Sequence, residues 1–419
     1  MFCFRVASFV FLLTFSLDEV VLLENGLART PPMGWMSWGF YMCGVKCKEN
    51  PDKCLNETLI LSVVDTFYKE GYQEAGYEYI IIDDCWSEKE RNKQGCLVPD
   101  KERFPNGMKY IADYIHARGL KFGMYTNIAE TTCMGYPGSR NYFAQDAKTF
   151  AEWDVDYLKV DGCFVGEDFL NIAYKMLGKQ LHLAGRPMVY SCSWPYYIRF
   201  IHNKMPDYSM ISKHCNLWRN YHDVMTSWIS ITGIVSYYEK SYNELAPHHG
   251  PGGWNDPDML ILGTNILTRG QSRVQMAVYA MLSAPLLLSC DMKNIKEYEK
   301  QLLLNLDLVA IAQDTLGIMA KPYELRELTL WLKPHLPMKG NSYLSYSFAI
   351  VNLSQNDLNT TFIPGDYGLN CTDGYTVMDV FTGVFLRNIS LQDAIDVSVP
   401  NEGRHDKSRE MKIVTAVPN

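Results

Sequence analysis

The sequence has no excess of basic residues and lacks the glycine motifs that bind phosphate. It carries 39 Lys and Arg against 47 Asp and Glu, for a formal net charge of −8 at pH 7. Nucleic-acid-binding domains normally show the opposite balance or a basic stripe. Neither a P-loop nor a G-x-G-x-x-G fingerprint occurs, so nucleotide chemistry has no support. We therefore expect no nucleic-acid partner.

Metal-binding and membrane-spanning patterns are also missing. There is no EF-hand spacing, and His248 and His249 lie in a Pro/Gly loop without a matching Cys or His pair. A Ca²⁺ or Mg²⁺ ion in an Asp-rich pocket is the alternative, but we expect no metal and no other cofactor. The longest apolar stretch, 276–288, is broken by Pro285. It indicates a core helix followed by a strand, so we expect no stable membrane anchor.

The N-terminal residues have the pattern of a signal peptide. Arg5 precedes an apolar run from Val6 to Phe15, which is too short to cross a bilayer. No A-x-A cleavage site is evident, and a buried N-terminal strand is the alternative. We predict a signal peptide over residues 1–17.

Cysteine content and N-x-[ST] sequons agree with export. Twelve cysteines are many for a reduced cytosolic enzyme. The predicted glycosylation sites are Asn56, Asn352, Asn359, Asn370 and Asn388. Together these features predict the secretory pathway, with the lysosome or the outside of the cell as the destination.

Short apolar runs alternate with amphipathic stretches through the first three quarters of the chain. This alternation is typical of parallel strands joined by helical crossovers. The expected strands are 33–37, 77–82, 120–125, 156–160, 187–192, 208–212, 252–255 and 286–289. Eight such strands predict an α/β fold, a (β/α)8 TIM barrel over residues 18–322.

The last hundred residues have a different texture. Runs at 328–332, 343–351, 375–385 and 411–417 are rich in β-forming residues, with turn residues between them. We predict that residues 323–419 form a C-terminal antiparallel β-sandwich domain.

Polar residues gather where the barrel strands end, and in a barrel these ends line the active site. The residues at these positions are Asp83, Asp84, Tyr125, Lys159, Asp161, Ser193, Asp256 and Asp258. Lys159 and Asp161 are two apart, so they point to the same side of their strand. A structural ion pair is the alternative explanation for that pair. Converging carboxylates with few histidines favour glycoside hydrolysis.

Seven longer segments resemble one enzyme family, the family 27 retaining glycoside hydrolases that include α-galactosidases and α-N-acetylgalactosaminidases. They are LENGLARTPPMGW at 23–35, IDDCW at 82–86, TCMGYPGS at 132–139, LKVDGC at 158–163, YSCSWP at 190–195, CNLWRNYHD at 215–223 and GPGGWNDPDM at 250–259. The similarity extends in order from about residue 23 to 320 and is weaker beyond. The resemblance implies a hydrolase of terminal α-galactosyl or α-N-acetylgalactosaminyl glycoconjugates, and a homodimer.

The resemblance also implies residue roles. Asp161 would be the nucleophile and Asp223 the general acid/base. Lys159 beside Asp161 is expected to keep the nucleophile ionised, and the acid is expected to have a raised pKa. The implied substrate-binding residues are Trp38, Asp83, Asp84, Tyr125, Cys133, Lys159, Cys163, Ser193, Tyr196, Tyr197, Arg219, Asp258 and Met259.

The implied disulfides are Cys43–Cys85, Cys47–Cys54, Cys133–Cys163 and Cys192–Cys215. Cys96, Cys290 and Cys371 are left without an assigned partner.

In this family, the segment after the fifth strand distinguishes sugars by their substituent at C2. Galactosidases of this type resemble C-E-W-P-L-Y there, and N-acetylgalactosaminidases resemble C-S-W-P-A-Y. This chain has Ser193 of the second pattern, but Tyr196 matches neither. We favour N-acetylgalactosamine, with galactose as a second substrate. A strict α-galactosidase is the alternative, and a non-catalytic sugar-binding relative is a third hypothesis.

Overall fold

The computed structural model describes residues 22–340, 342–353, 356–399 and 412–419. The signal peptide predicted for residues 1–17 lies outside the described residues.

Eight parallel strands form a curled sheet in the order β7-β6-β5-β4-β3-β2-β1-β8. The strands are β1 (Met33–Met36), β2 (Tyr79–Ile81), β3 (Lys121–Asn127), β4 (Tyr157–Asp161), β5 (Val189–Cys192), β6 (Leu217–Arg219), β7 (Trp254–Asp256) and β8 (Leu286–Leu288). Leu260 closes the sheet beyond β7, because its amide donates to the Leu287 carbonyl at 2.8 Å and its carbonyl accepts from Ser289. The sheet is therefore a TIM-like barrel, as the sequence predicted.

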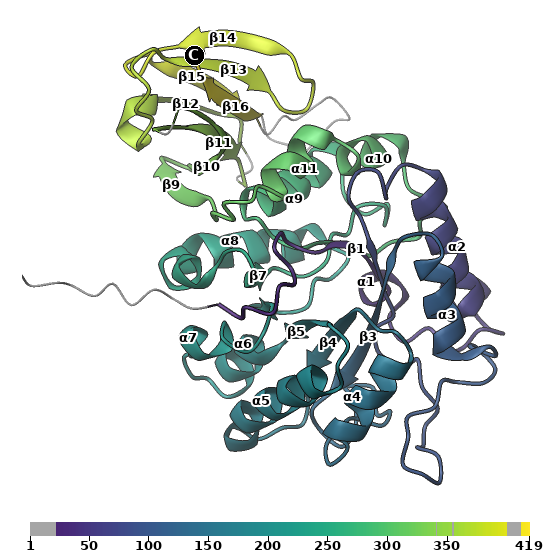
Figure 1. Cartoon of the computed structure of the whole chain (residues 1–419). Coiled ribbons are helices and arrows are strands. Elements are labelled where there is room, and N and C mark those ends of the chain that lie inside the picture. Colours follow the sequence, from purple (N-terminus) through teal and green to yellow (C-terminus); the bar gives the residue numbers. More distant parts are fainter. Residues whose placement is uncertain (1–21, 341, 354–355, 400–411) are drawn as a thin grey trace, which may run out of the picture.

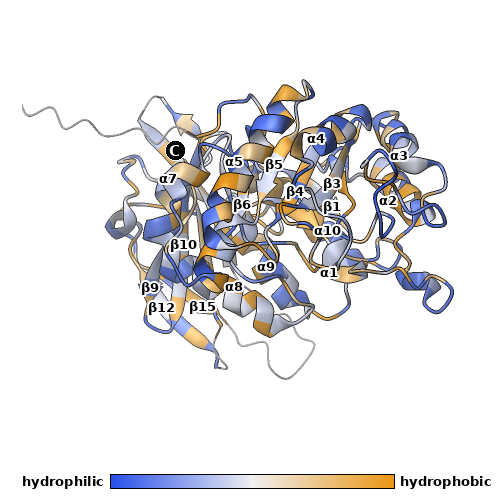
Figure 2. Cartoon of the chain, turned by 90° about the horizontal axis from the view of Figure 1, so that it is seen from below, coloured by the Kyte–Doolittle hydropathy of each residue, from blue (hydrophilic) through white to orange (hydrophobic). Residues whose placement is uncertain are grey.

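Helices surround the barrel, with hydrophobic residues gathered in the central strands (Figures 1 and 2). The long ones are α2 (Glu57–Lys69), α3 (Gly107–His116), α4 (Phe143–Glu152), α5 (Glu167–Leu183), α8 (Trp228–Leu245) and α9 (Arg269–Met281). The shorter ones are α1 (Trp38–Tyr41), α6 (Trp194–Tyr196), α7 (Tyr208–Ile211), α10 (Glu297–Leu303) and α11 (Leu306–Ala312). In α3 the buried residues Met108, Ile111 and Ile115 recur at helical spacing, which gives the helix one core-facing side.

One barrel strand was assigned to the wrong segment. The run at 208–212, expected to be the sixth strand, begins with helix α7. The Asp207 side chain accepts a hydrogen bond from the Met210 amide at 3.0 Å and caps this helix. The sixth strand is instead β6, which follows Cys215 and pairs in parallel with β5 and β7. The correction places Arg219 at the carboxyl end of a barrel strand.

The C-terminal part is antiparallel, as expected, and has more strands than the sequence indicated. A six-stranded sheet has the order β14-β13-β16-β11-β10-β9, and β12 pairs with β15 in a second sheet. The strands are β9 (Lys321–Leu325), β10 (Leu328–Lys339), β11 (Tyr343–Val351), β12 (Leu358–Phe362), β13 (Tyr375–Asp379), β14 (Phe385–Ile389), β15 (Ile395–Val399) and β16 (Lys412–Pro418). The run at 375–385 divides into β13 and β14, and β9, β12 and β15 were missed.

The barrel and the C-terminal sheet share apolar packing (Figure 1). Trp331, Val351 and Ile413 of the sheet belong to the same buried cluster as the barrel core. Helix α9, which lies between them, is buried from Val274 to Met281 without interruption. Because this core continues past residue 322, the domain boundary drawn there stays a prediction.

Candidate active site

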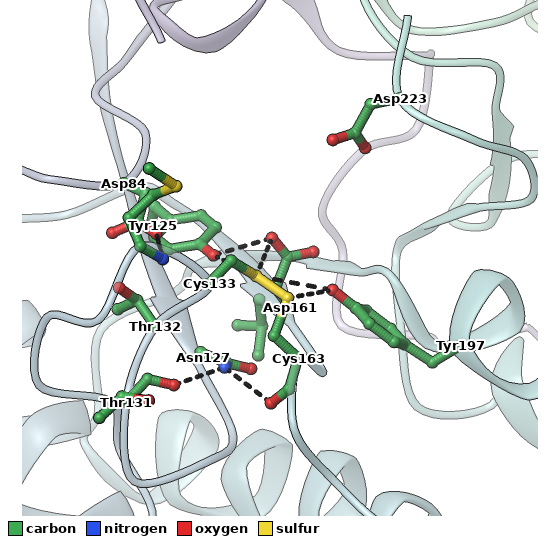
Figure 3. The surroundings of a disulfide bond; sticks show 12 residues. Asp84, Tyr125, Asn127, Thr131, Thr132, Cys133, Asp161, Cys163, Tyr197 and Asp223 are labelled. Carbon is green, nitrogen blue, oxygen red and sulfur yellow. Dashed lines mark hydrogen bonds between the residues drawn. A yellow bond between two sulfur atoms is a disulfide. The ribbon is translucent and has the colours of Figure 1, made fainter. Parts of the chain in front are cut away.

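Asp161 lies at the carboxyl end of β4 and is held from the neighbouring strand. In the β3–β4 register Tyr125 lies opposite Lys159, and Asn127 opposite Asp161. The Tyr125 hydroxyl donates to Asp161 Oδ2 at 2.8 Å. The sulfur of Cys133 lies 3.6 Å from the same oxygen (Figure 3). The carboxylate is therefore fixed on one side by a phenol and a disulfide.

Lys159 has a different direct partner from the one expected. Its Nζ lies 2.7 Å from Asp83 Oδ2, and both side chains are buried. Burial disfavours the charged lysine, but Asp83, followed by Asp161, raises the Lys159 pKa above its usual value. Burial raises the pKa of Asp83 to about 6 although Lys159 opposes the shift. Lys159 thus contributes positive charge near Asp161 while its ion pair is with Asp83, which follows β2.

Asp84 is the second carboxylate after β2. Its Oδ1 accepts from the Cys85 amide at 2.6 Å, and its Oδ2 accepts from the Met134 amide at 3.1 Å. Burial raises its pKa. The two bonds orient the carboxylate and join the β2 end to the loop after β3.

Asp223 lies in the loop after β6 and pairs with Arg219. Arg219 Nη2 donates to Asp223 Oδ1 at 2.7 Å, and the Asp223 side chain is 55% exposed. Burial acts to raise the Asp223 pKa, but Arg219, helped by Lys159 and a hydrogen bond from Trp38, lowers it overall. The expectation of a raised pKa for this residue was wrong, because Arg219, Lys159 and Trp38 together outweigh desolvation.

Arg219 also binds a second carboxylate. Its Nη1 lies 2.9 Å from Asp258 Oδ1, and both side chains are almost fully buried. Asp258 has a positive φ of 81° and receives the Val224 amide at 2.7 Å on its other oxygen. The Asp258 amide in turn donates to Asp256 Oδ1 at 2.8 Å. These bonds join the loops after β6 and β7 around one buried cation.

Tyr197 lies beside the disulfide that borders Asp161. Its hydroxyl lies 3.0 Å from Cys163 Sγ. Burial, Asp161 and then Asp223 raise the pKa of this phenol. Figure 3 shows Asp161 beside the disulfide and the Tyr197 hydroxyl, with Asp223 farther away on a different loop.

Ser193 and Tyr196 follow β5. Ser193 is 3% exposed and immediately precedes α6. Tyr196 is half-buried, and its ring centroid lies 5.1 Å from that of Tyr197 in an edge-on contact. Burial raises the Tyr196 pKa, Asp223 adds to the shift and Arg219 opposes it. The structure therefore places Tyr196 near Asp223 and Arg219.

The other predicted site residues lie at the same end of the barrel. Trp38 begins α1, next to Gly39, and Met259 is buried with its terminal carbon near Gly39. Residues 197–201 after α6 form a π-helical turn, a feature frequent at functional sites.

Four disulfides join the pairs that the resemblance implied. They are Cys43–Cys85, Cys47–Cys54, Cys133–Cys163 and Cys192–Cys215. Cys96, Cys290 and Cys371 carry free thiols. Several disulfides in one chain indicate folding in an oxidising compartment.

Sequence reasoning overlooked three residues of this region. Asn127 Nδ2 donates to the carbonyls of Thr131 (2.7 Å) and Cys163 (3.1 Å), which ties the disulfide loop to β3. Its spacing of two from Tyr125 on one strand could have indicated it. Phe200 and His222 pack on Tyr196 at centroid distances of 5.7 and 5.4 Å, and no sequence pattern indicated that contact.

Across the residues that the structure describes, no three His, Cys, Asp or Glu side chains form a metal-binding group. Within the same residues, no helix has the length and apolar character needed to cross a membrane.

Comparisons with known proteins agree with this geometry. A family model described as Alpha galactosidase A matches residues 30–314. The chain is 41% identical over 384 residues to the α-N-acetylgalactosaminidase of Gallus gallus, with 91% of this chain and 93% of the relative covered. It is 40% identical over 355 residues to α-galactosidase A of Homo sapiens, with 84% and 80% covered. The crystal structure of α-galactosidase I from Mortierella vinacea superposes with a TM-score of 0.78 at 27% identity, over 94% of this chain and 98% of that one.

Proposed function

Because the chain belongs to the alpha-galactosidase A family of glycoside hydrolases, we propose that it is a retaining exo-glycosidase. It removes terminal α-linked N-acetylgalactosamine from glycoconjugates, with galactose as a second substrate. The observation that carries this proposal is the placement of two oriented carboxylates at one end of the barrel. Asp161 is held by the Tyr125 hydroxyl at 2.8 Å and Asp223 by Arg219 at 2.7 Å.

The proposed reaction has two displacements at the anomeric carbon. Asp161 attacks this carbon while Asp223 gives a proton to the departing glycosidic oxygen, which leaves a covalent glycosyl–Asp161 ester. Asp223 then takes a proton from water, the water oxygen attacks the same carbon, and the bond to Asp161 breaks. Two inversions return the α configuration.

The ion pair with Arg219 suits the second step. It favours ionised Asp223, which is the form that removes the proton from water. The first step needs the protonated form, whose population increases as the pH falls. We therefore expect activity to rise from neutral toward acidic pH, as a lysosomal or secreted enzyme of an acidic environment would require.

The preference for N-acetylgalactosamine is supported by Ser193. Its short side chain is buried directly after β5, where a bulky glutamate would fill the space that an acetamide needs. Tyr196 is larger than the residue of either family pattern. The Tyr196 ring packs against Tyr197, Phe200 and His222. A ring held in this position is compatible with an acetamide beside it.

The test is a comparison of kcat/KM on p-nitrophenyl α-N-acetylgalactosaminide and p-nitrophenyl α-galactoside between pH 4 and 7. We expect turnover of both, with the first preferred. Tyr196→Ala should raise the ratio in favour of N-acetylgalactosamine, and Ser193→Glu should abolish turnover of that sugar while retaining galactose. Turnover of galactoside alone by the wild type would establish the strict α-galactosidase. Binding of both sugars without hydrolysis would establish the sugar-binding relative.

The homodimer and the assignment of the remaining pocket residues stay predictions of the resemblance, and the glycosylation sites stay predictions of the N-x-[ST] sequons. Of the predicted glycosylation sites, Asn359, Asn370 and Asn388 are exposed.

A further inference from the structure

The loop that carries Asp223 is fixed at both ends by buried hydrogen bonds. Before Asp223, Asn220 Nδ2 donates to Asn255 Oδ1 at 2.8 Å and to the Tyr238 hydroxyl at 3.0 Å. After it, the amide of buried Val224 donates to Asp258 Oδ2 at 2.7 Å. Only three residues lie between these anchors, and Asp223 is one of them.

The middle of this loop is held by rings. The Tyr221 ring stacks on Tyr237 with centroids 4.8 Å apart. The His222 ring, in an exposed residue, lies 4.5 Å from the Phe200 centroid and 5.4 Å from that of Tyr196. Tyr196 and Phe200 themselves touch, at 5.7 Å. We call Tyr196, Phe200 and His222 the aromatic bracket.

The aromatic bracket connects two parts of the proposed site. One part receives the C2 substituent of the sugar, and the other carries the acid/base Asp223. Tyr196 belongs to the segment that begins with Ser193, beside the proposed C2 pocket. His222 immediately precedes Asp223 in the chain. The Asp223 side chain is half exposed, so packing of its own methylene does little to fix it. Its orientation depends on Arg219, on Trp38 and on the backbone that His222 holds.

We propose that His222 is a positioning residue for the acid/base Asp223, and that it acts by ring packing against Tyr196 and Phe200. This inference rests on the proposed function. A shift of the loop displaces the carboxylate from the glycosidic oxygen, and small displacements of a catalytic group reduce rates strongly. We expect the lost rate to come from slower proton transfer by Asp223, because the aromatic bracket does not contact the nucleophile Asp161.

The test uses the dependence of the rate on the leaving group. A phenyl glycoside needs a proton from Asp223 as its bond breaks, whereas a 2,4-dinitrophenyl glycoside leaves as a stable anion and needs little help. In the His222→Ala variant we expect kcat/KM to fall about tenfold or more for the phenyl glycoside and less than about twofold for the dinitrophenyl glycoside. His222→Phe keeps a ring and should restore both values. His182→Ala, which removes an exposed histidine at the end of α5, is the matched control and should change neither.

A second measurement tests the second displacement, in which water hydrolyses the glycosyl–Asp161 ester. Hydrolysis of the glycosyl–Asp161 ester also needs Asp223, as a base, so kcat for the dinitrophenyl glycoside should fall in His222→Ala. Added azide attacks the anomeric carbon without a base, releases the Asp161 carboxylate and forms a glycosyl azide. We expect azide to restore this kcat in His222→Ala, with the glycosyl azide as product, and to leave the wild type almost unchanged.

Other results would overturn the inference. An equal loss on both glycosides, or no loss, would show that His222 does not position the acid/base. If His222→Phe behaves like His222→Ala, ring packing is not the cause. A wild-type protein that hydrolyses neither sugar would instead overturn the proposed function itself.

Discussion

At the scale of single residues, position along a strand decides what an aspartate does. Asp156 immediately precedes β4, and Asp161 is its last residue. Asp156 pairs with Arg186 at 2.6 Å and with His116 at 2.7 Å, away from the site. Asp161 instead receives the Tyr125 hydroxyl at the carboxyl end, where barrel enzymes place their chemistry.

The Asp161→Asn variant tests the nucleophile. The amide oxygen can still accept from Tyr125, so the fold should remain, but an amide cannot form the glycosyl ester. We expect kcat on the preferred aryl glycoside to fall at least about 1000-fold with an unchanged melting temperature. Asp156→Asn is the matched control, and it should lower stability while retaining kcat. Substantial residual activity in Asp161→Asn would remove the nucleophile assignment.

At the scale of elements, disulfides hold the loops that follow the strands. The Cys133–Cys163 bridge spans 30 residues and joins the loop after β3 to the residues after β4. Tyr125 and Tyr197 both contact its sulfurs, at 3.3 and 3.0 Å. The Cys47–Cys54 bridge spans only 7 residues, in the loop after α1.

Replacing both cysteines of one disulfide by serine separates its contribution to stability from its contribution to the active site. Loop entropy predicts a loss of about 3.5 kcal/mol for Cys133–Cys163 and about 2.5 kcal/mol for Cys47–Cys54. We expect kcat to fall at least about tenfold only in the first variant, because only there do Asp161 and Tyr197 lose a neighbour. Urea unfolding and kcat on one aryl glycoside would measure both effects. An equal effect of the two variants on kcat would contradict the local role.

At the scale of the whole molecule, the barrel buries carboxylates whose ionisation opposes folding. Burial raises the pKa of Asp256 from 3.8 to about 6. Between these values the folded protein binds a proton that the unfolded chain does not, so this contribution is complete below pH 3.8. It is lost as the pH rises through 6. The shift corresponds to at most about 3 kcal/mol.

We therefore expect Asp256→Asn to change the pH dependence of stability. The neutral amide removes the ionisation, so the variant should be more stable than the wild type at pH 7, by up to about 3 kcal/mol, and nearly equal near pH 4. Urea unfolding at the two pH values measures the difference. Parallel stability curves for Asp256→Asn and the wild type would contradict the argument.

The sequence predicted seven of the eight barrel strands, because long apolar runs between helical patterns have few other structures to adopt. The run beginning at Tyr208 was misassigned because a short apolar segment fits a helix as well as a strand. The Asp207 cap decided in favour of the helix. In the C-terminal part, β12 and β15 were missed because their alternation is short and rich in polar residues.

What the sequence determined by itself was the barrel, the family and the residues that gather at the strand ends, since periodicity and local motifs are properties of the chain order. Tertiary structure alone decided which charges meet. Lys159 pairs with Asp83, which follows β2, two strands away in the sheet, and Arg219 bridges Asp223 and Asp258 from two loops. The pairing with Arg219 lowers the pKa of Asp223, and all of these pairings depend on the register and curvature that close the sheet. The ring contacts around His222 have the same origin, because they join segments that meet only in the closed barrel.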